Sequence, residues 1–331
     1  MTILVTGGAG YIGSHMVHAL ADAGEQVIVL DNLSTGFRFL LPPGIPLIVG
    51  STGDRDLTAR VMREHRVESI IHFAASIVVP DSVRDPLGYY RNNTLNTCNL
   101  IDIAIANGVK HFIFSSTAAV YGNAERVPVR EDDPKLPISP YGSSKLMSET
   151  MLRDAAFAHG LRYVVLRYFN VAGADPQGRT GQATPQATHL IKVACEAATG
   201  KRAKVDVFGT DYATPDGTGV RDYIHVSDLA AAHVLALEAL IAEPARSLTM
   251  NCGYGRGFSV LEVLDAVDRV TNLKVERRIE DRRAGDAPSL VSDNARIKAA
   301  LPWVPQYAEL DTIVAHALQW ERKLDDIRPR A

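Results

Sequence analysis

Short apolar runs alternate with segments of helical spacing along the first half of the chain. The apolar runs that predict strands cover residues 2–6, 27–31, 47–49, 69–73, 111–115 and 163–168. Between them, apolar residues recur at intervals of three and four, as on the buried face of a helix; the clearest series is Ile12, Met16, Val17, Leu20 and Ala23. Runs such as "IIHFA" and "HFIFSS" are apolar on both faces, which is typical of central strands in a parallel sheet. The pattern predicts an α/β fold, a doubly wound parallel sheet with helices on both faces.

The pattern changes after residue 170. Residues 171–188 are rich in Gly, Pro, Gln and Thr without a clear period, and "FGTDYATPDGTGVRD" predicts a second long loop. Loops of this length are unusual in a compact domain unless they cover a ligand. Helical spacing returns over 226–242, with Ser227 as a candidate N-cap, and over 260–271. We therefore expect a first domain over 1–170 and a smaller, mixed α/β domain over 171–331, with "LTMNCG" able to return a strand to either.

Composition and charge exclude several classes of protein. The 331 residues include 35 basic and 38 acidic side chains, a net charge of −3, so the chain lacks the basic surface typical of partners of nucleic acids or acidic membranes. Three scattered cysteines (Cys98, Cys195 and Cys252) have no metal-binding neighbours and form no disulfide framework. No run of about 18 apolar residues predicts a membrane span, and the first residues begin a strand, not a leader peptide. We expect a cytoplasmic protein without a metal.

A Gly-rich stretch follows the first predicted strand. The sequence "TGGAGYIG" places Gly7, Gly10 and Gly13 in a G-x-x-G-x-x-G arrangement that opens a helix. Glycine permits the tight turn and lets backbone N–H groups approach a pyrophosphate at the helix N-terminus. Because a strand precedes the motif and an amphipathic helix follows it, the stretch predicts a Rossmann-type dinucleotide site.

An acidic residue ends the next predicted strand. Asp31 closes "VIVLD", about twenty positions beyond the glycines. A carboxylate at this place accepts hydrogen bonds from the adenosine ribose and repels a 2′-phosphate. The sequence therefore predicts NAD as the cofactor, in preference to NADP.

The stretch "SPYGSSK" carries candidate catalytic chemistry. Tyr141 and Lys145 are four residues apart at the start of a predicted helix, so both side chains can share one face. A lysine ammonium and an oxidised nicotinamide ring both favour a phenolate, which makes a tyrosine useful as a base near neutral pH. A third group is expected at a neighbouring strand end, where "FSST" offers Ser115, Ser116 and Thr117.

Taken together, the motifs resemble the extended short-chain dehydrogenases/reductases, and among them the UDP-glucose 4-epimerase family, over essentially the whole chain. The matching stretches are "TGGAGYIGSH", "HFAA", "YYRNN", "FSSTAAVYG", "PYGSSK", "LRYFNVAGA", "DGTGVRDYIHVSDLA" and "RRAGD". The resemblance implies a first, NAD-binding domain, a second domain that binds a UDP-sugar, and a homodimer packed through helices of the first domain.

The resemblance also implies a mechanism. Tyr141 would take the proton of the sugar 4-hydroxyl while C4 gives hydride to NAD, and Thr117 would hydrogen-bond the same oxygen. Lys145 would hold the nicotinamide ribose and lower the pKa of Tyr141. The 4-keto sugar would then rotate and take the hydride back on its other face, so that UDP-galactose and UDP-glucose interconvert.

The family pattern assigns two further sets of residues. Expected cofactor contacts, besides the catalytic residues, are Gly7, Gly10, Tyr11, Ile12, Gly13, Asp31, Asn32, Ser34, Thr35, Gly36, Phe73, Ala74, Ala75, Asn92, Tyr168 and Phe169. Expected substrate contacts, besides Thr117 and Tyr141, are Asn170, His189, Leu190, Val205, Val207, Phe208, Arg221, Arg283 and Asp286. The guanidinium groups among them suit a diphosphate.

Several alternatives stay open on the sequence alone. Either Ser51 or Asp54 could face the adenine, and Ile77 stands where some family members have a lysine near the cofactor. Leu290 occupies a place that helps decide whether an N-acetyl group fits, so a UDP-N-acetylhexosamine is a second candidate substrate. Epimerases of UDP-glucuronate or UDP-pentoses are further alternatives. A 4,6-dehydratase is disfavoured because alanines, not an acidic pair, follow Thr117. A non-catalytic NAD sensor or scaffold has no need of all three catalytic residues.

Overall fold

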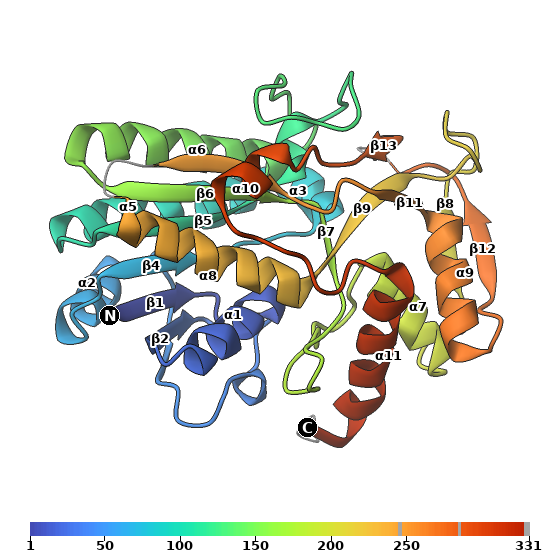
Figure 1. Cartoon of the computed structure of the whole chain (residues 1–331), viewed down its shortest axis with the longest axis horizontal. Coiled ribbons are helices and arrows are strands. Elements are labelled where there is room, and N and C mark those ends of the chain that lie inside the picture. The colour runs from blue at the N-terminus through green and yellow to red at the C-terminus, as the bar shows by residue number, and fades with distance from the viewer. Residues whose placement is uncertain (244–246, 284–285, 328–331) are drawn as a thin grey trace.

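A seven-stranded sheet forms the centre of the N-terminal part of the chain. The computed structural model describes residues 1–243, 247–283 and 286–327 (Figure 1). The strands run in the order β10-β6-β5-β4-β1-β2-β3, and every neighbouring pair is parallel. Their bounds are Thr2–Thr6 (β1), Gln26–Asp31 (β2), Leu47–Val49 (β3), Ser69–His72 (β4), His111–Thr117 (β5), Arg162–Tyr168 (β6) and Leu248–Cys252 (β10). The predicted doubly wound sheet is confirmed.

Helices cover both faces of this sheet because its strands alternate their apolar side chains between two cores. Ile3 and Val5 face a core shared with α1 and α8, whereas Leu4 faces a core shared with α2, α5 and α6. Figure 1 shows α1 beside α8, in agreement with their contacts. The helices of this part are Tyr11–Asp22 (α1), Arg55–Glu64 (α2), Val79–Arg84 (α3), Pro86–Tyr89 (α4), Asn96–Ala106 (α5), Pro140–His159 (α6), Val226–Ala242 (α8) and Ala295–Ala300 (α10).

Shorter elements complete this part. A π-helical turn, η2 (Tyr90–Leu95), joins α4 to α5. Two 3₁₀ turns, η1 (Arg38–Leu40) and η3 (Ala118–Tyr121), follow β2 and β5.

The second part has its own apolar core between short strands and three helices. The strands are Asn170–Ala172 (β7), Val205–Phe208 (β8), Val220–His225 (β9), Gly257–Ser259 (β11), Arg277–Glu280 (β12) and Ser289–Leu290 (β13). The helices are Leu190–Ala198 (α7), Val260–Thr271 (α9) and Leu310–Ile327 (α11). Its core joins α7, α9 and α11 to β8. Figure 1 shows this part beyond the carboxyl ends of the parallel strands, with β7 and β9 between the two.

Local sequence signals explain where the main helices begin and end. Ser139 caps α6, since its hydroxyl accepts a hydrogen bond from Gly142 N at 3.2 Å, and Pro140 takes the first helical position. Gly160, with a φ of 72°, ends the same helix in the left-handed region. A capping box of Ser259 and Glu262 starts α9.

Two expectations on the chain's organisation are settled by the structure. Ser227 is not the N-cap of α8: the helix begins after His225, whose Nδ1 accepts the Ser227 N–H at 3.0 Å. The imidazole occupies the capping position, so the serine falls inside the first turn. The segment "LTMNCG" returns to the first sheet, where β10 pairs with β6 and buries Met250 and Cys252.

Within the described ranges, no helix combines the length and apolarity needed to cross a bilayer. The same ranges contain no group of three or more His, Cys, Asp or Glu side chains placed to hold a metal ion.

Candidate active site

The Gly-rich loop packs so closely that Gly7 and Gly13 leave no room for a side chain. Gly7 has a φ of +69°, and a Cβ there would lie 2.6 Å from Ala74 N. A Cβ on Gly13 would lie 2.1 Å from the Gly7 oxygen, and one on Gly10 would lie 3.2 Å from it. No side chain caps the start of α1, whose N-cap is Gly10. The first N–H groups of α1 therefore suit an anion such as a pyrophosphate, and the cradle fits NAD.

Asp31 lies beside this loop at the end of β2. Its Oδ2 accepts the Ala9 N–H at 2.9 Å and its Oδ1 accepts the Leu33 N–H at 2.8 Å. Burial raises the pKa of Asp31, and these two N–H donors oppose that rise. The following turn folds back on the loop, because a Cβ on Gly36 would lie 2.9 Å from Ala9. Asp31 and Gly36, two of the predicted cofactor residues, therefore adjoin the Gly-rich loop.

The two candidates for the adenine side, Ser51 and Asp54, lie between the end of β3 and the start of α2. Asp54 is the N-cap of this helix, where its Oδ1 accepts the Leu57 N–H at 3.0 Å. Ser51 comes two residues after the end of β3, at the carboxyl edge of the sheet. The Ser51 Oγ is occupied as well, since it accepts the Gly53 N–H at 3.1 Å, so which of the two residues faces the adenine stays open.

The three predicted catalytic residues meet at the carboxyl end of β5. Thr117 is the last residue of β5, and Tyr141 is the second residue of α6. Burial raises the pKa of Tyr141 above its ordinary value, and a hydrogen bond with the Thr117 hydroxyl opposes that rise. Lys145 lies one turn further along α6, and its Nζ donates to Ser115 O at 2.7 Å. The three residues thus come together because α6 carries Tyr141 and Lys145 one turn apart, next to the end of β5, which carries Thr117.

Lys145 is in an unusual environment for a lysine. Only 3% of it is exposed, and its Nζ lies 4.9 Å from the centre of the Phe114 ring. Burial lowers the pKa of Lys145 to about 7, against an opposing effect of Glu149. Its charge therefore changes within the neutral pH range. That Lys145 lowers the pKa of Tyr141 stays a prediction.

Other predicted cofactor residues line the same edge of the sheet. Phe73 N donates to Thr6 O at 2.9 Å, which holds the 73–75 segment against the Gly-rich loop. Asn92 lies in the π-helical turn η2 and donates from Nδ2 to Ser76 Oγ at 2.9 Å. Tyr168 is directed away from this edge, since its hydroxyl shares a hydrogen bond with His233 in the core. Any cofactor contact of Tyr168 would therefore use its backbone.

The predicted substrate residues form two groups. Phe208 and Arg283 stack, with the guanidinium 4.3 Å from the ring centre, and Arg283 Nε lies 3.3 Å from Asp286 Oδ2. Val205 and Val207 do not join this group through their side chains, which are buried in the core of the second part. In a strand, alternate side chains point to opposite faces, so only the backbone of β8 and Phe208 stay available to a base.

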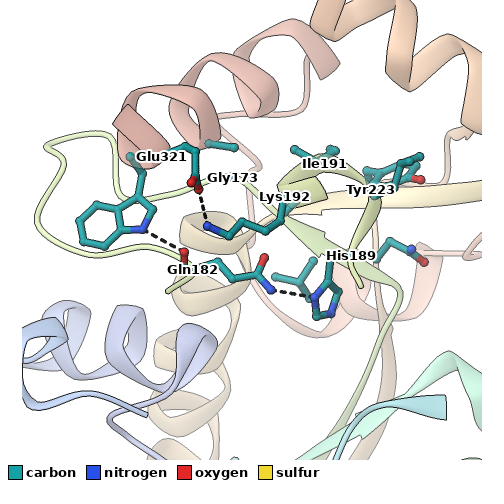
Figure 2. Close-up of a pocket in the computed structure, with 13 residues that line it drawn as sticks. Gly173, Gln182, His189, Ile191, Lys192, Tyr223 and Glu321 are labelled. Carbon is teal, nitrogen blue, oxygen red and sulfur yellow. Dashed lines mark hydrogen bonds and ion pairs between the residues drawn. The ribbon is translucent and has the colours of Figure 1, made fainter. Parts of the chain in front are cut away.

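The second group surrounds a small cavity between α7, α11 and β7. It is lined by Asn170, His189 and Leu190, together with Gln182, whose Nε2 lies 2.7 Å from His189 Nδ1 (Figure 2). Its volume of about 20 Å³ has room for about one water molecule, so it does not hold a sugar nucleotide by itself. Burial lowers the pKa of His189, which keeps the imidazole neutral.

Arg221 belongs to neither group. It lies on β9, opposite Leu290 of β13, and its Nη1 donates to the neighbouring Val220 O at 2.9 Å. Its guanidinium has no acidic partner among the ion pairs of the described residues.

Sequence reasoning missed a buried ion pair behind the catalytic triad. Glu149 of α6 and Arg167 of β6 form a salt bridge at 2.6 Å, with 8% and 5% of their side chains exposed. The sequence does contain a sign of this pair: a charged residue stands among helix positions in "MSETM", and another stands in the apolar strand "LRYFN". It could not be interpreted before the strand order was known.

Comparisons with known proteins identify relatives across the whole chain. The model of the NAD dependent epimerase/dehydratase family matches residues 3–253. A UDP-glucose 4-epimerase from Azospirillum brasilense is 59% identical over 98% of this chain and 92% of its own length. The crystal structure of UDP-glucose 4-epimerase from Brucella ovis in complex with NAD is 44% identical, with a TM-score of 0.92 over 97% of this chain and 98% of that chain.

A third relative adds a nucleotide. The UDP-glucose 4-epimerase from Bifidobacterium longum, solved in complex with NAD⁺ and UDP, is 36% identical and has a TM-score of 0.93 over 98% of this chain and 99% of that chain. The resemblance inferred from the motifs is confirmed: the chain belongs to the NAD dependent epimerase/dehydratase family, and the relatives it matches over nearly their full lengths are UDP-glucose 4-epimerases.

Proposed function

We propose that this chain is an NAD-dependent enzyme that epimerises a UDP-sugar at C4, with UDP-galactose and UDP-glucose as the preferred pair. The observation that carries the proposal is the meeting of Tyr141, Lys145 and Thr117 at the same carboxyl edge of the sheet as the Gly-rich loop, two strands away. The relatives described above support both the cofactor and the reaction.

The chemistry divides between the cofactor and the chain. The Gly-rich loop and Asp31 would hold NAD, which would supply a reversible hydride acceptor for C4 of the sugar. Tyr141 takes the proton of the 4-hydroxyl and later returns it, because it lies at the start of α6 with its hydroxyl bonded to Thr117. Thr117 holds the same oxygen through both half-reactions. Lys145 supplies a positive charge that favours the phenolate form of Tyr141.

The substrate side supplies a diphosphate and base site. Arg221 and Arg283 are the cations that we assign to the diphosphate, since a planar guanidinium binds two phosphate oxygens at once. Phe208, stacked under Arg283, is assigned to the uracil ring. If the chain binds the UDP half firmly and the sugar only weakly, the 4-keto sugar can rotate between the two hydride transfers.

The identity of the sugar is the least determined part of the proposal. Leu290 packs with Val120, Tyr121 and Phe169 in a small apolar cluster. The UDP-Glc/GlcNAc 4-epimerase from Campylobacter jejuni, 44% identical with a TM-score of 0.84, supports an N-acetylated sugar as a second substrate. Ala118 and Ala119 follow Thr117, which leaves no acid there for a dehydratase. A homodimer and a cytoplasmic location stay predictions.

Conversion of UDP-galactose tests the proposal. The purified chain, without added cofactor, is incubated with UDP-galactose and the products are identified by chromatography and nuclear magnetic resonance. We expect UDP-glucose without net formation of NADH. A 4-keto-6-deoxy sugar would indicate a dehydratase, and unchanged UDP-galactose together with bound NAD would favour the sensor or scaffold. UDP-N-acetylgalactosamine, offered in a parallel reaction, decides the second substrate.

A further inference from the structure

Glu149 is a buried carboxylate one helical turn beyond Lys145 on α6. Its Oε1 accepts hydrogen bonds from the Ser116 hydroxyl and from Arg167 Nε, the latter at 3.0 Å. Its Oε2 accepts one from Arg167 Nη2 at 2.6 Å. A buried carboxylate is costly unless it is paired and hydrogen-bonded. The position of Glu149 is therefore fixed by both of its partners.

These partners lie on two neighbouring strands. Ser116 of β5 is directly opposite Arg167 of β6 in the sheet register. Ser116 also stands between Ser115, whose carbonyl accepts Lys145 Nζ, and Thr117. Helix α6 is thus attached to two successive residues at the end of β5, once through Lys145 and once through Glu149.

The network continues beyond the arginine. Arg167 Nη1 donates to the Tyr121 hydroxyl at 2.8 Å, and that hydroxyl donates to Asn251 Oδ1 at 2.6 Å. Tyr121 ends the 3₁₀ turn η3, which begins directly after Thr117. The segments on both sides of Thr117 are consequently tied to the same ion pair.

We propose that Glu149 is a positioning residue: together with Arg167 and Ser116, it holds the helix that carries Tyr141 and Lys145 in register with the strand end that carries Thr117. The inference rests on the proposed epimerisation, because the groups it positions are those of that reaction. A displacement of about 1 Å between reacting groups can lower a rate about 100-fold, so the tie acts on turnover, not on substrate affinity.

The charge of Glu149 also acts on Lys145. The groups that face the ammonium are the Phe114 ring and Ser115 carbonyl of β5, His72 of β4 and Glu149 of the same helix. His72 is neutral near pH 7, since burial and Lys145 lower its pKa to about 3. Glu149 is the group among these that raises the pKa of Lys145. Its loss would deprotonate Lys145 at lower pH.

Three variants of the NAD-loaded protein test the proposal. Glu149→Gln removes the charge and keeps the shape, Ser116→Ala removes one tie and keeps the charge, and Asp154→Asn is the matched control on the exposed side of α6. For Glu149→Gln we expect kcat to fall about 10- to 100-fold, with KM for UDP-galactose and NAD content near wild type. The alkaline limb of its kcat profile moves to lower pH. Ser116→Ala lowers kcat by a smaller factor without moving that limb, and Asp154→Asn changes neither.

The outcomes separate a positioning role from a purely structural one. Wild-type kcat and pH profile in Glu149→Gln would overturn the proposal, as would a loss of kcat fully explained by the unfolded fraction measured by circular dichroism. If Glu149→Gln does not fold, Ser116→Ala decides: an unchanged kcat overturns the proposal, and a lowered kcat with unchanged KM supports it. Failure of the proposed function itself is distinct, since the wild-type protein would then leave UDP-galactose unconverted.

Discussion

At the scale of single residues, the chemistry depends on two hydroxyls and one buried lysine. Tyr141 and Thr117 share a hydrogen bond although they are 24 positions apart, because one opens α6 and the other closes β5. The sequence predicted these residues from order and spacing. It could not predict that Lys145 bonds the Ser115 carbonyl, since that contact depends on how α6 packs against β5.

Replacement of Tyr141 by Phe tests the proton carrier. The substitution removes the hydroxyl and keeps the ring, so we expect kcat to fall about 10²- to 10⁴-fold while bound NAD and the unfolding temperature stay near wild type. Steady-state kinetics measures kcat, the absorbance of released cofactor measures bound NAD, and thermal unfolding gives the unfolding temperature. Tyr163→Phe, on β6 outside the site, serves as the control. Near-normal turnover in Tyr141→Phe would remove this residue from the mechanism.

Lys145 predicts a pH dependence of stability with a definite sign. Its pKa is about 7 in the folded chain, against 10.5 for an ordinary lysine in an unfolded chain, so the unfolded state binds more protons between these values. The lysine therefore destabilises the fold below pH 7, and this penalty decreases as pH rises toward 10.5. Relative to wild type, Lys145→Met is expected to be most favoured below pH 7 and progressively less so above it. Urea unfolding at several pH values measures the difference; a difference independent of pH would contradict the assignment.

At the scale of helices and strands, regular patterns were sufficient for several elements in both parts of the chain. The apolar runs predicted β1 and β3 to the residue, and helical spacing did the same for α8 and α9. Predictions failed where side-chain chemistry replaced periodicity, as at the start of α8, where His225 is the N-cap in place of Ser227. The two-residue strand β13 is too short to show a period.

The N-cap of α6 offers a test at this scale. Ser139 Oγ accepts the Gly142 N–H, and Tyr141, the proposed proton carrier, lies between these two residues. We expect Ser139→Ala to lower the free energy of unfolding by about 1 kcal/mol and to lower kcat more than it raises KM. Ser143→Ala, on the same helix turn, is the matched control. Equal effects of the two substitutions in urea unfolding and kinetics would contradict the capping role.

At the scale of the whole molecule, the strand order was the main unknown. The run "LTMNCG" could have joined either sheet, and its place beside β6 follows from the fit of Met250 and Cys252 into the core with α8. The substrate side was predicted less completely, because its residues come from loops and short strands far apart in sequence. Val205 and Val207 illustrate the limit: the resemblance assigned them to the substrate side, but their side chains are buried in the core.

A buried ion pair fixes the C-terminal helix to the second part. Lys192 of α7 pairs with Glu321 of α11, and Glu321 also pairs with Lys201 at 2.7 Å (Figure 2 shows the first pair). Only 7% and 2% of the side chains of Lys192 and Glu321 are exposed. We expect Glu321→Leu to lower the free energy of unfolding by about 3–5 kcal/mol, and the added Lys192→Met to recover part of that loss.

An exposed ion pair provides the comparison for the Glu321 and Lys192 variants. Glu309 lies 3.8 Å from Arg256 with 77% of its side chain exposed, so Glu309→Gln is expected to cost about 0–1 kcal/mol. Urea unfolding of the single and double variants measures the coupling. A Glu321→Leu variant as stable as Glu309→Gln would show that the buried pair does not hold α11 in place.

The central claim is that hydride leaves C4 and returns to the same carbon without exchange with water. Conversion of UDP-galactose in deuterium oxide tests it directly, with the product analysed by proton nuclear magnetic resonance and mass spectrometry. The account predicts UDP-glucose that keeps protium at C4, formed without net NADH. Deuterium at C4 would contradict it, because the configuration would then have been inverted through proton exchange with solvent.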